Sequence, residues 1–298
     1  MVRLKFSIQL AYQVLDRTCD FIFNIQPACT DRQRVIVESL AISQPLAFQT
    51  LIHASEGGRY LRLQAQTGPL EVLYQGVVEI AHHMEDPAAL REMPVSDLPL
   101  DALIYVYPSR YCQSDKLRAL ANFEFGAMLP GYYRVLAIQE WVNRRTRFLS
   151  GSSGGGTSAL DTLVDQAGVC RDFAHLMISL CRALNIPARF VSGIDYGADP
   201  SLGATDFHAY VEVMLSGRWY LFDPSGVAPP MGLVRLGTGR DAADVAFATV
   251  FGSVVSESPR VEIDALVDVE NGVYLPVYHP QALSSAGQEV SAFRELTC

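Results

Sequence analysis

The chain has 298 residues, 49% of them hydrophobic, which is enough for one large or two medium hydrophobic cores. Its formal net charge of −9 and pI near 5.1 argue against nucleic acid or an anionic membrane surface as a partner. The sequence contains no run of about 18 apolar residues, and its six cysteines show no CxxC spacing. We therefore predict a cytoplasmic protein with reduced cysteines, no membrane span and no secretion signal.

The first part of the chain predicts a β-rich domain. Short segments rich in β-branched and aromatic residues are separated by turn residues such as Gly57-Gly58 and Gly68-Pro69. These segments are 20–25, 34–37, 59–63 and 71–74. Residues 86–101 are rich in proline and acidic residues and lack periodicity, which is typical of a connector. We predict an N-terminal β-sandwich-like domain over residues 1–100 and a second domain over residues 101–298.

Helices and one glycine-rich loop follow the connector. Helices are predicted over 117–125, around Trp141 and over 160–166, the last with Thr157 as its cap. The serine and glycine run at 150–156 cannot bury apolar surface, so we expect it to be mobile. A phosphate-binding loop would need a Lys-Ser/Thr pair after the glycines, which the sequence lacks. A lid over the neighbouring site is the favoured interpretation.

A cysteine begins the next predicted helix, in the sequence GVCRDFAH around Cys170. A thiol attacks a carbonyl carbon as its thiolate. A helix N-terminus and a nearby imidazolium lower the pKa of a thiol from about 8.5 to about 3.5–7.5. His175 lies roughly 140° around the helix from Cys170, so we expect it to be structural. The helix is indicated by apolar residues at three- and four-residue spacing: Phe173, Leu176, Met177, Leu180 and Leu184.

A predicted β-hairpin then carries a histidine and an aspartate. Residues 206–215 alternate as a strand, and a two-residue Ser-Gly turn leads into the return strand 218–224. The register set by this turn makes Asp223 the diagonal neighbour of His208 on one face of the hairpin. This places His208 as general base and acid, with Asp223 holding the orientation of its imidazole.

Each of these residues also has a structural interpretation. A cysteine on a helix is most often an inert core residue, and a histidine on a strand is as often a satisfied polar residue as a catalyst. A cysteine at a helix start, a histidine and an aspartate in matching register are much rarer together. Their combination favours a Cys-His-Asp triad over three unrelated structural residues.

Four segments resemble the core of bacterial transglutaminase-like cysteine peptidases: 168–176, 184–193, 207–213 and 219–224. The resemblance is strong over residues 157–247, including the segment 239–246, and loose in the N-terminal part. It implies a papain-like α+β core with Cys170 as nucleophile, His208 as general base and acid, and Asp223 as the orienting residue. The hairpin register agrees with these roles independently.

The chemistry of such a site leaves several activities open. The leading hypothesis is an amide or peptide hydrolase that forms a thioester on Cys170 and acts on a peptide or protein. The alternative is protein-glutamine γ-glutamyltransferase activity, in which an amine replaces water. A third hypothesis is a catalytically silent interaction module, which the intact triad argues against. The oligomeric state is left open by the sequence.

Residues that contact the substrate are predicted with weaker signals. Trp141 has the spacing of a core helix residue, which leaves Gln166, four residues before the nucleophile, as the side-chain candidate for the oxyanion site. Tyr196 and Tyr210 are candidate subsite walls, and acidic residues near the hairpin favour a basic or amine-bearing substrate. We expect no cofactor and no metal, because no metal-binding spacing occurs. These acidic residues are Asp195, Asp199, Asp206 and Glu212.

Overall fold

The computed structural model describes residues 1–53, 57–199 and 205–286. The end of the predicted second domain, residues 287–298, lies outside the described residues. The first sheet is built on two very long antiparallel strands, β1 (Val2–Gln26) and β4 (Arg59–Ile80), which pair along almost their whole lengths. β2 (Gln33–Ile42) and β3 (Phe48–Ile52) pair with β4.

The paired strands β1 and β4 double back on themselves. Tyr12 and Phe21 are nine residues apart, a span of about 30 Å along an extended strand. Their ring centroids are nevertheless only 5.1 Å apart. The bend falls at the register shift between Val14 and Thr18, where residues 15–17 are exposed. Two layers therefore enclose an apolar core, in agreement with the predicted β-sandwich-like domain.

The second sheet has four antiparallel strands in the order β10-β9-β8-β11. The hairpin of β9 and β10 has the predicted register, with Tyr220 opposite Val213 and Phe222 opposite Val211. This sheet is the β part of the α+β core that the sequence predicts. Its strands are β8 (Ala188–Asp195), β9 (Phe207–Leu215), β10 (Arg218–Phe222) and β11 (Leu233–Gly239).

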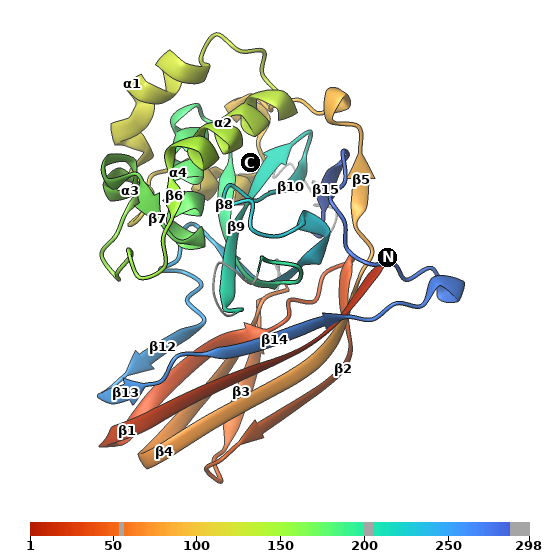
Figure 1. The fold of residues 1–298 in the computed structure, drawn as a ribbon. Helices are drawn as coiled ribbons and strands as arrows, with labels where there is room; N and C mark the ends of the chain where they lie inside the picture. Colours follow the sequence, from red (N-terminus) through yellow and green to blue (C-terminus); the bar gives the residue numbers. More distant parts are fainter. Residues whose placement is uncertain (54–56, 200–204, 287–298) are drawn as a thin grey trace, which may run out of the picture.

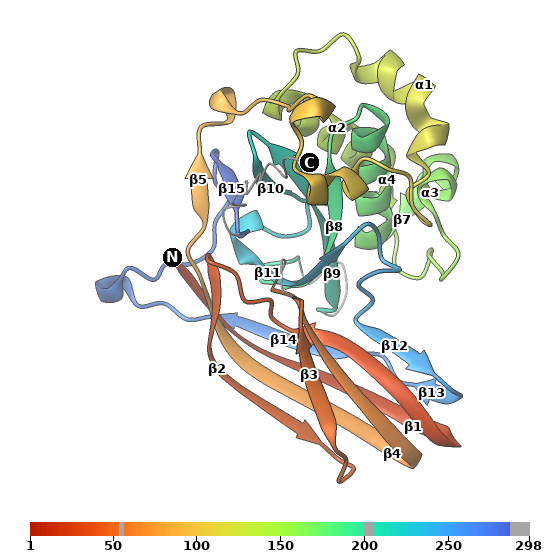
Figure 2. The same cartoon turned by 180° about the vertical axis from the view of Figure 1, so that it is seen from behind.

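Helices cover one face of this sheet, and the first domain covers the other (Figures 1 and 2). Val211 and Val213 face α4, whereas Val191 and Tyr210 join the core of the first domain. The alternation of side chains along a strand separates these two environments. The helices are α1 (Ser114–Phe125), α2 (Tyr132–Arg145), α3 (Ala159–Asp165) and α4 (Cys170–Ala183).

The chain returns to the first sheet near its C-terminal end. β12 (Ala248–Phe251), β13 (Val254–Ser256) and β14 (Arg260–Ala265) all pair with β1. A division at residue 100 assigns these strands to the second domain, but their pairing places them in the sheet of the first. β5 (His83–Glu85) is the reverse case, because it lies within residues 1–100 but pairs with β15 (Ala282–Ser284) of the C-terminal part.

The predicted connector contains three 3₁₀ turns, and two short strands flank the segment that holds the glycine-rich loop and α3. The turns are η1 (Pro87–Ala89), η2 (Val95–Asp97) and η3 (Leu100–Tyr105). The flanking strands β6 (Arg147–Phe148) and β7 (Ala167–Gly168) pair in parallel. Further turns are η5 (Pro230–Gly232) and η6 (Val269–Asn271).

Two further sequence predictions can be compared with the fold. The cap of α3 is Ser158 rather than Thr157, because the Asp161 carboxylate accepts a hydrogen bond from the Ser158 N–H at 2.9 Å. Trp141 is 6% exposed and packs edge-on against Phe125 in the helical core, as its spacing predicts.

Within the described residues, no helix combines the length and apolar character needed to cross a bilayer.

His175 is a buried structural residue of α4, as predicted. Its Nε2 accepts a hydrogen bond from the Ala242 N–H at 3.2 Å, and its ring stacks on Tyr111 with centroids 5.0 Å apart. Burial lowers the pKa of His175 well below 6.5, and the charges of Arg171 and Arg182 lower it further. The imidazole is therefore neutral in the folded protein at neutral pH.

This neutral imidazole makes stability fall in mild acid. Below about pH 6.5 the unfolded chain binds a proton at residue 175 that the folded chain rejects. The free energy of unfolding then decreases by up to about 1.4 kcal/mol per pH unit. In His175→Gln, urea unfolding at pH 7.5 and 5.5 should show a loss smaller by about 1.4 kcal/mol than in the wild type. Equal losses in the two proteins would contradict this role.

Candidate active site

Cys170 is the first residue of α4, where main-chain N–H groups are left without helical partners. The Asp172 carboxylate accepts a hydrogen bond from the Val169 N–H at 2.8 Å and so fixes the helix start. Gly168 is required before it, because a Cβ there would lie 2.6 Å from the Asp172 Cβ. Within the described chain, no hydrogen bond engages the N–H groups of Cys170 and Arg171.

The glycine-rich loop lies beside Cys170 and is hydrogen-bonded to the start of α4. Arg171 donates to the Ser153 Oγ at 2.7 Å and to the Gly154 carbonyl at 2.6 Å. The Ser153 hydroxyl in turn donates to the Asp172 carboxylate at 2.9 Å. Tyr111 donates its hydroxyl proton to the Gly155 carbonyl at 2.8 Å. The two residues after Cys170 in α4 thus connect the loop to the start of the helix.

The imidazole of His208 meets the carboxylate of Asp223 across the hairpin. Its Nε2 lies 3.2 Å from the Asp223 Oδ2, and both side chains are buried. The other oxygen of Asp223 accepts hydrogen bonds from the Ser225 N–H at 3.0 Å and the Ser225 hydroxyl at 2.6 Å. Asn143 of α2 donates to the Ser225 carbonyl at 3.1 Å and so holds this turn from outside. Asp223 therefore occupies the diagonal position that the register predicts.

The thiol of Cys170 converges on the same imidazole. Its Sγ lies 3.9 Å from the carbonyl oxygen of Phe207, the residue just before His208. Burial disfavours protonation of His208, but the charge and hydrogen bond of Asp223, followed by those of Cys170, hold its pKa well above 6.5. His208 is therefore poised as an imidazolium between a thiol and a carboxylate.

A second carboxylate at this imidazole was not identified from the sequence. The Asp195 Oδ2 lies 3.2 Å from the Nδ1 of His208. Gly193 of β8 pairs with His208 of β9, which makes Asp195 the diagonal neighbour of His208 from the opposite strand. The sequence showed Asp195 only as one of several acidic residues near the hairpin. The register of β8 against β9 would have been needed to identify it.

Burial raises the pKa of both carboxylates, but the neighbouring charges and hydrogen bonds differ, so the net pKa shifts have opposite signs. Burial raises the pKa of Asp223, but the charge and hydrogen bond of His208 and the bonds from Ser225 leave it below 3.8. Burial raises the pKa of Asp195; His208 opposes this, and the charges of Asp223 and Asp206 add to it, so that the pKa stays above 3.8. Asp223 is therefore the more firmly ionised of the two.

Two family models match the chain, and both concern transglutaminases. The N-terminal domain of bacterial transglutaminase matches residues 2–101, and the transglutaminase-like superfamily matches residues 121–224, which include Cys170, His208 and Asp223. A crystal structure from Cytophaga hutchinsonii, named "putative cysteine protease", is 38% identical, with a TM-score of 0.87 over 95% of this chain and 97% of that one. The chain belongs to the transglutaminase-like superfamily.

Part of the chain is also similar to curated proteins from mycobacteria. An uncharacterized Mycobacterium leprae protein is 31% identical over 45% of this chain and 49% of its own length. An uncharacterized Mycobacterium tuberculosis protein (strain H37Rv) is 32% identical over 41% of this chain and 42% of its own length. The match thus spans about half the length of these curated relatives or less.

The transglutaminase-like core places the predicted substrate-contacting residues in different environments. Tyr210 is fully buried, and its ring lies 6.3 Å from that of His208, so it supports the imidazole and has no open surface for substrate. Tyr196 is half-buried against the core of the first domain. Asp206 is exposed at the start of β9, and its carboxylate accepts the Phe207 N–H at 2.7 Å.

Gln166, the candidate oxyanion donor, ends α3 in a left-handed conformation with φ of 53°. Its side chain is exposed, and its carbonyl accepts a hydrogen bond from the Arg147 N–H at 2.9 Å. Among the described residues, no hydrogen bond joins the Gln166 side chain to another group. The free N–H groups at the start of α4 are thus the better-placed oxyanion donors in this structure.

The C-terminal part of the chain also reaches the site, although its sequence gave no sign of chemistry. Tyr278 donates its hydroxyl proton to the Gly226 carbonyl at 3.4 Å. Burial raises the pKa of Tyr278, and the charge of Asp223 raises it further. A cavity of about 300 Å³ adjoins this point, lined by Gln139, Glu140, Asn143, Arg144, Asp223 and Gly226.

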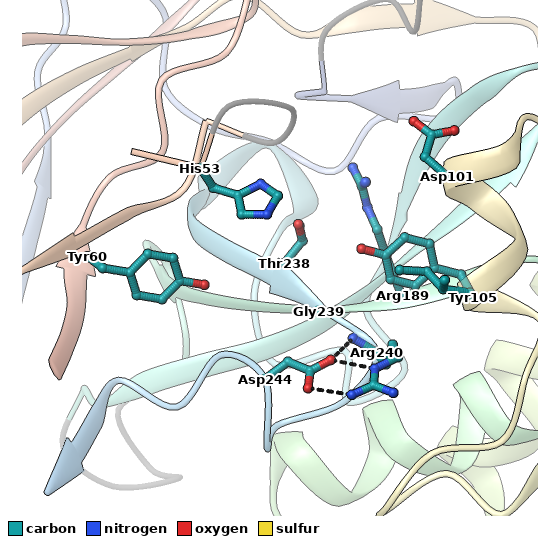
Figure 3. Close-up of a pocket in the computed structure, with 10 residues that line it drawn as sticks. His53, Tyr60, Asp101, Tyr105, Arg189, Thr238, Gly239, Arg240 and Asp244 are labelled. Carbon is teal, nitrogen blue, oxygen red and sulfur yellow. Dashed lines mark hydrogen bonds and ion pairs between the residues drawn. The ribbon is translucent and has the colours of Figure 1, made fainter. Parts of the chain in front are cut away.

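A larger cavity, of about 400 Å³, lies where the first domain, η3 and the second sheet meet (Figure 3). His53 and Tyr60 contribute from the first domain, and Arg189 and Arg240 from the core. Arg240 donates three hydrogen bonds to the Asp244 carboxylate, from its main-chain N–H at 2.9 Å and from its guanidinium at 2.9 and 3.0 Å, and Figure 3 marks contacts of this pair as dashed lines. Arg189 is likewise bound to the carboxylate of Glu212, at 2.7 Å. The positive charges of this cavity are therefore compensated within the protein.

Proposed function

We propose that this chain is a thiol-dependent acyl enzyme that hydrolyses amide or peptide bonds through a thioester on Cys170. The observation that carries the proposal is the position of His208, whose buried imidazole contacts the Asp223 carboxylate at 3.2 Å and interacts with the partly buried thiol of Cys170. Such a constellation activates a thiol and then protonates a leaving nitrogen. The substrate would be a peptide or protein.

In the acylation step, the Cys170 thiolate attacks the carbonyl carbon of the substrate, and a carbon–sulfur bond forms. The carbonyl oxygen becomes an oxyanion, which the N–H groups of Cys170 and Arg171 at the start of α4 would stabilise. The carbon–nitrogen bond then breaks, and the leaving nitrogen takes the proton from the Nδ1 of His208. Asp223 keeps the imidazole oriented through its Nε2.

In the deacylation step, a water molecule attacks the thioester carbonyl and gives one proton to His208. The carbon–sulfur bond breaks, the carboxylic acid leaves, and the thiolate and imidazolium are restored. A primary amine in place of water would give a new amide, which is the transglutaminase reaction. The similarity to a protein named as a putative cysteine protease supports hydrolysis as the leading activity.

Product analysis distinguishes the two acyl acceptors. The full chain is incubated with a peptide library in ¹⁸O-labelled water, with and without a biotinylated primary amine, and the products are identified by mass spectrometry. We expect cleaved or deamidated peptides that carry one ¹⁸O atom and no biotin, and no product from Cys170→Ala. Biotinylated glutamine side chains that form only with active Cys170 would overturn hydrolysis in favour of amine transfer.

A further inference from the structure

We propose that Asp195 is a second positioning residue for the catalytic imidazole, which accepts the Nδ1–H of His208 while Asp223 accepts the Nε2–H. Both carboxylates lie 3.2 Å from the ring, one at each nitrogen, and the exposed fractions of the three side chains are between 2% and 7%. The inference rests on the proposed function, because it assigns a role at the same site. The superfamily triad of Cys170, His208 and Asp223 does not include this residue.

The strand order explains how two carboxylates reach one imidazole. His208 lies on β9, between β8 and β10, and each neighbouring strand supplies the residue diagonal to it. Asp195 is the last residue of β8, and Asp223 follows the last residue of β10. Because diagonal side chains on one face of a sheet approach each other, the ring is held from both sides.

The number of protons at the ring follows from this arrangement. A neutral imidazole has one N–H and one lone pair, and a lone pair repels a carboxylate oxygen. Two ionised carboxylates, one at each ring nitrogen, therefore require the imidazolium form. Asp195 thus favours the same protonation state of His208 that a thiolate at Cys170 requires. Its carboxylate lies 3.2 Å from the Nδ1, opposite the contact of Asp223 with the Nε2, and this pair of contacts limits rotation of the ring.

The charged and titratable groups around Asp195 are few. From β9 it faces His208 and the charge of Asp206, and from the turn after β10 the charge of Asp223. On its other side β11 presents Leu233, which is apolar and pairs with Asp195. From α4, Cys170 acts on the shared imidazole. His208 is thus the cation that stabilises the ionised form of Asp195.

The test measures the pKa of His208 directly, in chains that lack the nucleophile. Side-chain NMR of ¹³C- and ¹⁵N-labelled histidine is recorded against pH in Cys170→Ala and in Cys170→Ala with Asp195→Asn. The signal is assigned by its loss in His208→Gln. We expect both ring nitrogens to be protonated at pH 7.5 in Cys170→Ala, and the pKa of His208 to fall by about 1–3 units with Asp195→Asn. Asp264→Asn, which removes an exposed charge from β14, serves as the control.

The outcomes separate this inference from the proposed function. A singly protonated His208 at pH 7.5, or a pKa that Asp195→Asn leaves unchanged, overturns the role of Asp195, whatever the reactivity of Cys170. The nitrogen signals of Cys170→Ala can overturn the inference in this way even if Asp195→Asn does not fold. In contrast, a thiol at Cys170 that reacts like any free cysteine would overturn the proposed function and leave the NMR result standing.

Discussion

Cys170→Ala is expected to lower kcat/KM for the peptide substrate by about 10⁴–10⁶-fold, because no other group can form the thioester. His208→Ala should lose about as much, since the thiolate and the protonated leaving nitrogen both depend on the imidazole. The double variant should be no worse than either single variant, because the residues of a triad act as one unit. Rates are measured by mass spectrometry with a peptide identified in the library experiment.

An exposed cysteine provides the control for this prediction. Cys29 lies on the surface of the first domain, so Cys29→Ala should keep the full wild-type rate. A loss of less than about tenfold in Cys170→Ala would mean that the thioester mechanism is wrong. Additive losses in the double variant would mean that Cys170 and His208 act separately.

Glu212→Ala is expected to have the largest effect on stability, about 3–5 kcal/mol of the free energy of unfolding. Glu212 is fully buried on β9, and its carboxylate accepts from the Arg189 Nε at 2.7 Å. Its other oxygen lies 3.6 Å from the Arg235 guanidinium. The guanidinium of Arg189 also stacks on Trp219, 4.1 Å from the ring centroid. Removal of this carboxylate takes a negative charge from between two buried cations.

Urea unfolding at neutral pH measures the effect of Glu212→Ala. Glu140→Ala is the matched control, because Glu140 is 54% exposed and its pair with Arg144 spans 3.6 Å in solvent. We expect the control to lose less than about 1 kcal/mol. If Glu212→Ala were as stable as the control, the buried charges of the second sheet would not depend on this residue.

The hairpin and helix of the candidate site could be predicted because their signals are local. A two-residue turn and a side-chain period of two leave one register, so the pairing of Tyr220 with Val213 followed from the sequence alone. The apolar spacing after Cys170 likewise indicates a helix without knowledge of its neighbours. The position of Asp223 relative to His208 is a consequence of this short-range geometry.

The rest of the site depends on pairings that a local pattern does not encode. The segment between β8 and β9 does not fix their register, so the approach of Asp195 to His208 could not be derived. β12, β13 and β14 resemble strands of any sheet, and nothing in their pattern names β1 as their partner. The alternation of β9 separates two faces, but it does not show that the first domain buries the face of Tyr210.

The most direct test of the central claim is the rate of alkylation of each cysteine against pH, measured by mass spectrometry in the wild type and in His208→Ala. A thiolate–imidazolium pair predicts that Cys170 alone reacts fast well below pH ~7, and that His208→Ala removes this reactivity. If Cys170 instead reacts only as the pH approaches about 8.5, as an ordinary free thiol does, and His208→Ala changes nothing, the thiol-enzyme account is contradicted.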